Sequence, residues 1–162
     1  MKTTRPYTML NPEGVYFITF SVVFWIDVFI RLRYKNIIVE SLNDCIKQKG
    51  LVVHGWCLMS SHVHLIISAK DPDKVVLADV LRDLKKFTSG QILREIEAGN
   101  ESRQSWLLDK FRFAASQNSR NSAYQFWQQN NHAIELTSNF LKEQKLNYIH
   151  ENPVKDGWVE EP

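Results

Sequence analysis

The chain has 162 residues, of which 44% are hydrophobic and 12% are aromatic. This length and composition predict one domain with a real hydrophobic core, which excludes intrinsic disorder and two independent domains. The formal net charge of +2 permits a nucleic-acid partner without arguing for one, because such binding depends on clustered charge rather than on the total.

The first half of the chain predicts three strands and a helix. Residues 14–23 are β-branched and aromatic, which is typical of a strand. Apolar side chains recur at helical spacing over residues 34–49, and a glycine follows as a stop signal. Residues 51–58 and 62–68 are again strand-like and are separated by a short turn, so we expect a hairpin.

The second half predicts two longer helices, a short helix and one more strand. The turn at residues 71–73 opens a long helix, and residues 106–113 form a shorter one. Residues 124–128, with an extension toward Ile134, are the best fourth strand. A last helix over about 138–152 begins at a serine cap and ends before Pro153.

This order of elements is that of the split β-α-β arrangement. We expect an α+β, ferredoxin-like sandwich with a four- to five-stranded antiparallel sheet. An extra C-terminal helix, which carries Tyr148, follows the last strand. Because one fold can host many functions, function has to be argued from the site residues.

The sequence also bears on the cellular compartment. Cys45 and Cys57 lack the C-x-x-C spacing and are too few for a disulfide framework, which favours a reducing cytosol. No stretch reaches the about 20 apolar residues that span a bilayer, and the N-terminus lacks the apolar region of a signal peptide. We expect a cytoplasmic protein without a membrane partner, with a single domain over residues 1–162 and a core at about 14–159.

The sharpest local motif is His62-Val63-His64, on the third predicted strand. Residues two apart on a strand project from the same face with their Cα atoms roughly 6.5–7 Å apart, so both imidazoles can converge on one divalent cation. The spacing alone leaves a plain alternative open, in which the histidines are only half-exposed side chains on the open face of the sheet.

A second pair, Tyr148 and Asn152, shares one face of the last helix. A tyrosine can be a covalent nucleophile and an amide oxygen can be a metal ligand. In the alternative interpretation, Tyr148 is a core residue and Asn152 only terminates the helix. The polar side of the long helix adds a basic face that either follows DNA phosphates or is solvated surface, made of Arg82, Lys85 and Lys86.

Two segments resemble the single-tyrosine HUH transposases, an IS200-like family, and especially their REP-associated group. Residues 56–67, WCLMSSHVHLII, resemble the HUH segment of that family. Residues 148–159, YIHENPVKDGWV, resemble its tyrosine signature. The segments 84–88 and 126–128 resemble further landmarks, so the likeness covers nearly the whole chain.

The resemblance implies a role for each matching residue. His62 and His64 would bind Mg²⁺ or Mn²⁺, Tyr148 would be the nucleophile, and Asn152 stands where the family places a third polar ligand. The implied activity is metal-dependent cleavage and rejoining of hairpin-bearing DNA ends through a 5′-phosphotyrosine. Single-stranded or hairpin DNA would be the partner, and the family includes both monomers and homodimers.

Two other functions stay open at this point. The first is a catalytically silent or domesticated DNA-binding protein of the same fold that acts on palindromic repeats, although the intact histidines and tyrosine argue against it. The second is a metal-dependent hydrolase without covalent chemistry. It would need carboxylate ligands near the third strand, and Asp71 and Asp73 are several residues away.

Overall fold

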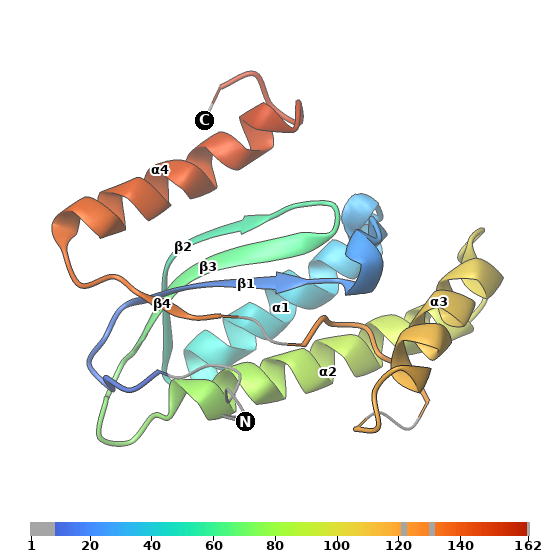
Figure 1. Cartoon of the computed structure of the whole chain (residues 1–162), viewed down its shortest axis with the longest axis horizontal. Helices are drawn as coiled ribbons and strands as arrows, with labels where there is room; N and C mark the ends of the chain where they lie inside the picture. The colour runs from blue at the N-terminus through green and yellow to red at the C-terminus, as the bar shows by residue number, and fades with distance from the viewer. Residues whose placement is uncertain (1–8, 121–122, 130–131, 162) are drawn as a thin grey trace.

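The computed structural model describes residues 9–120, 123–129 and 132–161 (Figure 1). Within these residues the sheet has four antiparallel strands: β1 (Tyr16–Ser21), β2 (Leu51–Leu58), β3 (His62–Ala69) and β4 (Ile134–Glu135). Their order is β2-β3-β1-β4, so β3 lies between β1 and β2, as the split β-α-β arrangement requires. The predicted α+β, ferredoxin-like fold is confirmed.

Strand alternation divides the side chains of the sheet between two apolar layers. One face, which includes Phe20 and Leu65, belongs to the main core. The opposite face, which includes Phe17 and Ile66, forms a smaller cluster with Ile149 of the last helix. The two faces therefore have different environments, and the histidines of β3 lie on the second one.

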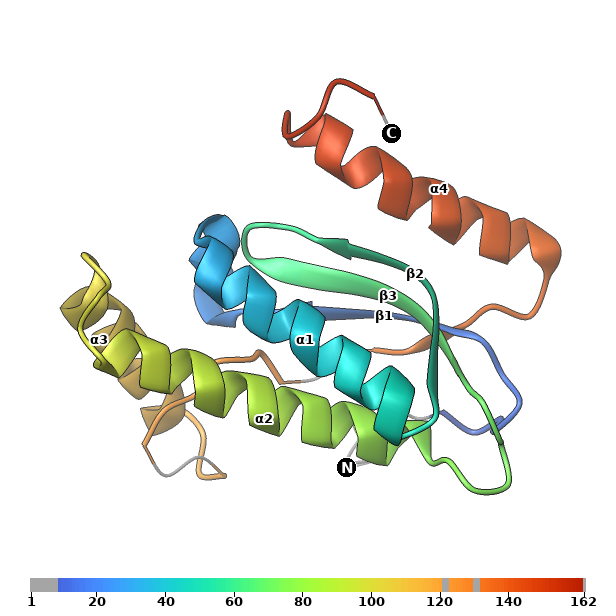
Figure 2. The same ribbon diagram turned by 180° about the vertical axis from the view of Figure 1, so that it is seen from behind.

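Helices cover both faces of the sheet. α1 (Leu32–Gln48) and α2 (Leu77–Glu97) lie side by side on the main-core face, as Figure 2 shows from behind. α4 (Asn139–Lys155) crosses the opposite face, and α3 (Gln104–Ser116) packs against α2 (Figure 1). No helix in the described ranges is long and apolar enough to cross a membrane.

The fourth strand does not include residues 124–128, where the sequence predicted most of it, and lies at the Ile134 end of that prediction. Residues 124–128 make only an isolated bridge, between Val22 and Trp127, and β4 lies later in the chain. The rings of Phe126 and Trp127 are both buried against Phe29, with centroid distances of 6.2 and 5.9 Å. Adjacent side chains of a regular strand point to opposite faces, so two neighbouring rings in one core preclude strand geometry there.

The long helix α2 begins later than the sequence predicted. Residues 71–73 form a turn, in which the Asp71 carboxylate accepts the backbone N–H of Asp73 at 3.2 Å and the Asp71 carbonyl accepts that of Val75 at 2.9 Å. An aspartate side chain that bonds to nearby backbone donors competes with helix formation. The helix therefore starts only at Leu77.

α4 continues through Pro153 to Lys155, where the sequence predicted an end near Asn152. A proline inside a helix lacks an N–H donor and its ring crowds the carbonyl four residues earlier, but later residues, such as Asp156, still bond to the preceding turn. The helix ends where Gly157 adopts a left-handed φ of 72°, with the Trp158 N–H donating to the Pro153 carbonyl at 2.8 Å. Asn152 is consequently held inside a regular helix, one turn after Tyr148.

A buried carboxylate ties the start of α1 to the loop before α3. The Glu101 side chain is fully enclosed and accepts from the Tyr34 hydroxyl at 3.1 Å and the Arg33 guanidinium at 3.2 Å. Arg31 and Arg103 form longer ion pairs with it, at 3.7 and 3.6 Å. Burial alone would raise the pKa of Glu101, but the Arg103 N–H, Tyr34 and Arg31 outweigh burial and hold that pKa below its ordinary value.

We expect Glu101→Ala to lower the free energy of unfolding by about 3 kcal/mol, because it leaves arginines and a buried hydroxyl without their partner. Urea unfolding at pH 7 measures the change. Because the folded pKa is lowered, the stabilisation is present above the ordinary carboxyl pKa and is lost as the pH falls through the lowered value. The exposed Glu95→Ala is the matched control, and equal stability of the two variants would contradict this role of Glu101.

Candidate active site

His62 and His64 project from β3 onto the face that α4 covers. Their ring centroids are 4.7 Å apart, with an interplanar angle of 73°. His64 is only 4% exposed, while His62 is half-buried. The structure therefore brings the two imidazoles together on one face of the sheet, beneath a helix rather than in open solvent.

A hydroxyl group orients each histidine through its Nδ1 atom. Thr19 Oγ1, from the paired position on β1, lies 2.7 Å from Nδ1 of His64, and Ser61 Oγ lies 3.1 Å from Nδ1 of His62. Nε2 is then the nitrogen of each ring that remains for a ligand. In the described part of the chain, Nε2 of His64 is buried without a hydrogen-bond partner, which is costly unless a ligand satisfies it.

The environment keeps both imidazoles uncharged near neutral pH. Burial, together with the neighbouring His62 and Lys145, lowers the pKa of His64 to about 3. Burial also lowers the pKa of His62, against the opposing attraction of the Asp156 carboxylate. Neutral imidazole is the form that coordinates metal ions, so neither ring has to lose a proton before binding one.

Tyr148 stands over this pair from α4 of the same chain. Its ring centroid lies 5.2 Å from that of His64 and 5.9 Å from that of Phe17, both in edge-to-face geometry. Lys145 places its ammonium 5.4 Å from the centre of the Tyr148 ring and 4.7 Å from that of Phe17. Tyr148 is 40% exposed, so one chain supplies a histidine pair and a tyrosine that a substrate can reach.

The packing of α4 on β2 sets the position of Tyr148. Ile149 is buried in the cluster between helix and sheet, and a Cβ atom at Gly55 would come within 3.2 Å of Leu146 Cδ1. A side chain at Gly55 would therefore require Leu146 to shift by a few tenths of an ångström. Asn152 shares the helical face of Tyr148, and its amide nitrogen is buried with no partner among the described residues.

These side chains fit a divalent cation. Two neutral imidazoles and the amide of Asn152 are donors that Mg²⁺ or Mn²⁺ accepts, and imidazole suits Mn²⁺ better than Mg²⁺. The His64 Nε2 atom, buried and without a hydrogen-bond partner in the described ranges, is the observation that supports a ligand here. The same ranges contain no group of three or more His, Cys, Asp and Glu side chains placed to hold a metal, so Asn152 and oxygens from outside the chain would complete the ligand set.

The predicted basic face lies elsewhere. Arg82, Lys85 and Lys86 belong to α2, on the main-core side of the sheet, away from the histidine pair. Arg82 is paired with two aspartates of its own helix at 2.6 and 3.1 Å. Lys85 donates to the Gln128 carbonyl at 3.1 Å, and burial lowers its pKa to about 8. The structure does not bring these three residues to the candidate active site, and their contact with DNA stays a prediction.

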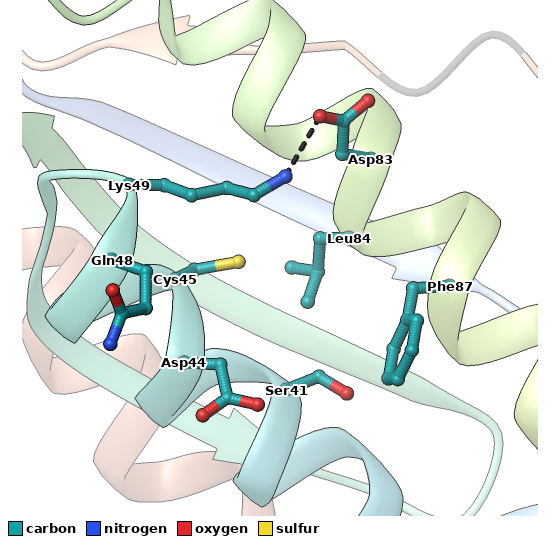
Figure 3. A pocket seen from close by; sticks show the side chains of 8 residues that line it. All are labelled: Ser41, Asp44, Cys45, Gln48, Lys49, Asp83, Leu84 and Phe87. Atoms are coloured by element: carbon teal, nitrogen blue, oxygen red, sulfur yellow. Dashed lines mark hydrogen bonds and ion pairs between the residues drawn. The ribbon is translucent and has the colours of Figure 1, made fainter.

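A separate pocket of about 420 Å³ opens between α1 and α2 (Figure 3). Lys49 and Asp83 form an ion pair of 2.8 Å across it, and the Cys45 sulfur lies near Leu84 in its wall. Burial raises the pKa of the Cys45 thiol, which makes this cysteine a poor nucleophile. The pocket contains no group from the site under α4, and we assign no chemistry to it.

Sequence reasoning missed Thr19 and Lys145. The contact of Thr19 with His64 depends on the register between β1 and β3, which no local pattern fixes. Lys145 precedes Tyr148 by three residues on a helix, and this spacing was the one signal that could have identified it.

The site thus consists of a His-x-His strand beneath a tyrosine-bearing helix, on a split β-α-β sheet. Residues 25–122 match the family described as "Transposase IS200 like", and the chain belongs to this family. Such transposases are DNA transesterases and are generally metal-dependent. Among curated proteins, the comparison gave no match.

Two solved structures share the fold. A REP-associated tyrosine transposase bound to a REP hairpin matches with a TM-score of 0.65 and 17% sequence identity, over 99% of this chain and 77% of that one. A protein of Deinococcus radiodurans R1 described as a transposase matches with a TM-score of 0.52 and 17% identity, over 92% of this chain and 95% of that one. At this level of identity the likeness shows the fold, while the roles of individual residues have to be argued from the site.

We expect Thr19→Val to weaken Mn²⁺ binding by about 10- to 100-fold, because it removes the hydroxyl that orients His64 while keeping the shape of the side chain. Titration of Mn²⁺ followed by electron paramagnetic resonance measures the affinity. Thr19→Ser keeps the hydroxyl and should bind close to the wild-type level. Equal affinities of the valine and serine variants would show that the Thr19 hydroxyl does not support the site.

Proposed function

We propose that this chain is a metal-dependent transesterase that cleaves and rejoins single-stranded, hairpin-bearing DNA ends through a 5′-phosphotyrosine at Tyr148. One observation carries the proposal: the Tyr148 ring packs edge-to-face on His64, at a centroid distance of 5.2 Å, within the same chain. The nucleophile and the candidate metal ligands are thus adjacent without help from a second molecule. A homodimer is compatible with this arrangement but is not needed to assemble the site.

The residues that would hold the cation are His62 and His64, through their Nε2 atoms, and Asn152, through its amide oxygen. A bound Mg²⁺ or Mn²⁺ would withdraw charge from a non-bridging phosphate oxygen and fix the phosphorus relative to the tyrosine. The hydroxyls of Thr19 and Ser61 hold the two rings in place on the opposite nitrogen. The chain therefore contributes a rigid, uncharged ligand pair beneath the nucleophile.

The reaction at Tyr148 exchanges one phosphate ester for another. A bond forms between the phenolic oxygen and phosphorus, the bond from phosphorus to the 3′ oxygen breaks, the phenolic proton passes to water, and the leaving oxygen takes up a proton as a free 3′-hydroxyl. Because ester replaces ester, little free energy is lost and rejoining needs no ATP. The Lys145 ammonium, over the Tyr148 ring, adds positive charge where the phosphate has to approach.

A second candidate function is a catalytically silent DNA-binding protein of the same fold. It needs neither a reachable tyrosine nor ordered imidazoles, whereas this chain keeps both, with Tyr148 40% exposed and both histidines oriented by hydroxyls. That combination favours the enzyme.

The test of the proposed function uses single-stranded DNA that folds into a hairpin with unpaired flanks, in a set of different flanking sequences. Incubation with Mn²⁺ should give a protein–DNA adduct that survives a denaturing gel, and a chelator should prevent it. Hairpin binding without any adduct, over a range of Mn²⁺ concentrations and flanking sequences, would favour the silent DNA-binding protein instead.

We also expect hairpins with unpaired flanks to bind better than blunt duplex, because the net charge is only +2 and unstacked bases can reach aromatic side chains. Gel-shift titrations at several salt concentrations compare the two. Binding to the duplex should be the weaker one and should fall steeply with salt. Stronger binding to the blunt duplex would contradict a preference for single strands.

A further inference from the structure

Two consecutive aromatic residues between β1 and α1 adopt a backbone conformation that favours glycine. Phe24 has a φ of 56° and Trp25 a φ of 54°, and they are the residues other than glycine with positive φ in the described chain. Left-handed backbone is sterically unfavourable for side chains of this size. Such strain persists where surrounding contacts enforce it, and it gathers at functional sites.

Both aromatic side chains are exposed, and that of Trp25 lies beside the candidate active site. Trp25 is 58% exposed, and its ring lies edge-to-face with that of His62 at a centroid distance of 5.3 Å. Phe24 is 52% exposed and its ring lies 6.0 Å from that of Phe113 on α3. Two adjacent large apolar rings left in solvent, one of them next to a proposed metal ligand, are unexplained by the folding of this chain alone.

The backbone around these rings is firmly anchored. The Val22 N–H donates to the Ser61 carbonyl and the Phe29 N–H to the Ser60 carbonyl, both at 2.8 Å. These bonds tie the aromatic segment to the turn that leads directly into His62. The backbone on either side of the two rings is therefore anchored to the turn before the strand that carries the histidine pair.

Phe24 also borders an open hollow of about 510 Å³, between its own segment and the chain after α3. The wall is rich in amide side chains: Gln117, Asn118, Gln125, Gln128 and Gln129. Gln125 and Gln128 donate to the backbone carbonyls of Trp127 and Val22, which fixes part of this wall. Amide groups are suited to hydrogen bonding with the edges of bases, and aromatic rings to stacking on their faces.

We propose that Trp25 and Phe24 form a stacking platform for unpaired DNA bases, which leads the single strand from His62 to the amide-lined hollow. The proposal deepens the proposed function, on which it rests, by naming the surface that holds the strand beside the site. Stacking on aromatic rings accepts any base, because every base has a π-face. The amide-lined hollow then supplies hydrogen-bonding groups that could distinguish one base from another.

The test measures binding apart from chemistry. Fluorescence anisotropy, with Tyr148→Phe protein and no divalent metal, compares a DNA hairpin flanked by unpaired thymidines with the same hairpin made blunt. Trp25→Ala should weaken binding of the flanked hairpin by about 5- to 100-fold and leave the blunt hairpin unchanged. Phe87→Ala, with 51% exposure on α2, is the matched control and should change neither.

Trp25→Gly separates the ring from the backbone. Glycine adopts positive φ readily, so this variant should keep or raise the melting temperature and still lose the affinity for the flanked hairpin. If folded Trp25→Gly bound the flanked hairpin with wild-type affinity, or lost affinity equally for the flanked and the blunt hairpin, the proposed stacking platform would be wrong. Because no adduct is needed here, failure of the platform is distinct from failure of the proposed function, which the wild-type adduct assay decides.

Discussion

Tyr148→Phe should abolish the covalent protein–DNA adduct while hairpin binding stays close to the wild-type level. The change removes only the hydroxyl, and the ring contacts with His64 and Phe17 are kept. A denaturing gel after incubation with hairpin DNA and Mn²⁺ measures the adduct, and gel-shift titration measures the binding. The loss should be complete within detection, because no other described tyrosine ring contacts the histidine pair.

Tyr124→Phe is the matched control for this prediction. The Tyr124 hydroxyl accepts a hydrogen bond from Arg112 of α3 at 3.3 Å, away from α4. Removal of this hydroxyl should leave the adduct unchanged. Adduct formation by Tyr148→Phe at the wild-type rate would show that another residue, or an activated water, carries the chemistry.

His64→Ala should lower the affinity for Mn²⁺ by more than about 100-fold, since loss of a direct ligand exceeds the 10- to 100-fold effect of supporting residues. The adduct should disappear at ordinary metal concentrations and return in part when Mn²⁺ is raised. Calorimetric titration measures the affinity, and circular dichroism checks that the variant is folded.

His54→Ala is the control for metal binding. His54 lies on β2 in an exposed position, and its Nε2 atom is 2.8 Å from Ser68 Oγ. Removal of this imidazole should change neither the metal affinity nor the amount of adduct. If His64→Ala bound Mn²⁺ as tightly as His54→Ala, His64 would not be a ligand.

Much of the fold follows from local periodicity. β2 was predicted with the bounds it has, and α1 within two residues at its start, because alternating and helical apolar patterns each bury one face. The same alternation placed His62 and His64 side by side. Their roles as ligands, like those of Tyr148 and Asn152, stay predictions that the variants above test.

The predictions of secondary structure that were wrong concern elements that depend on contacts between residues distant in sequence. The fourth strand was misplaced because the rings of Phe126 and Trp127 share one core around Phe29, which is nearly 100 residues earlier in the chain. Pro153 did not end α4, because the stop comes from the left-handed Gly157. The basic face of α2 was predicted either to follow DNA phosphates or to be solvated surface. The structure exposes Arg82 and Lys86 but partly buries Lys85, and a linear sequence could not show that the sheet separates this face from the histidines.

Residues that support the site could not be predicted from the sequence either, because their contacts also join residues distant in sequence. Thr19 meets His64 through strand register, and Trp25 meets His62 because strained backbone turns its ring back toward β3. Neither contact has a signature in local spacing. The close approach of α4 at Gly55 likewise depends on Leu146, which is on a distant helix.

The most direct test of the account is to find the amino acid that carries the DNA. The adduct formed with hairpin DNA and Mn²⁺ is digested with nuclease and protease, and the peptide that retains a nucleotide is sequenced by mass spectrometry. The account predicts a 5′-linked nucleotide on Tyr148, within the helical segment that packs over His64. A nucleotide on any other residue, or a phosphate ester linked through its 3′ end, would contradict it.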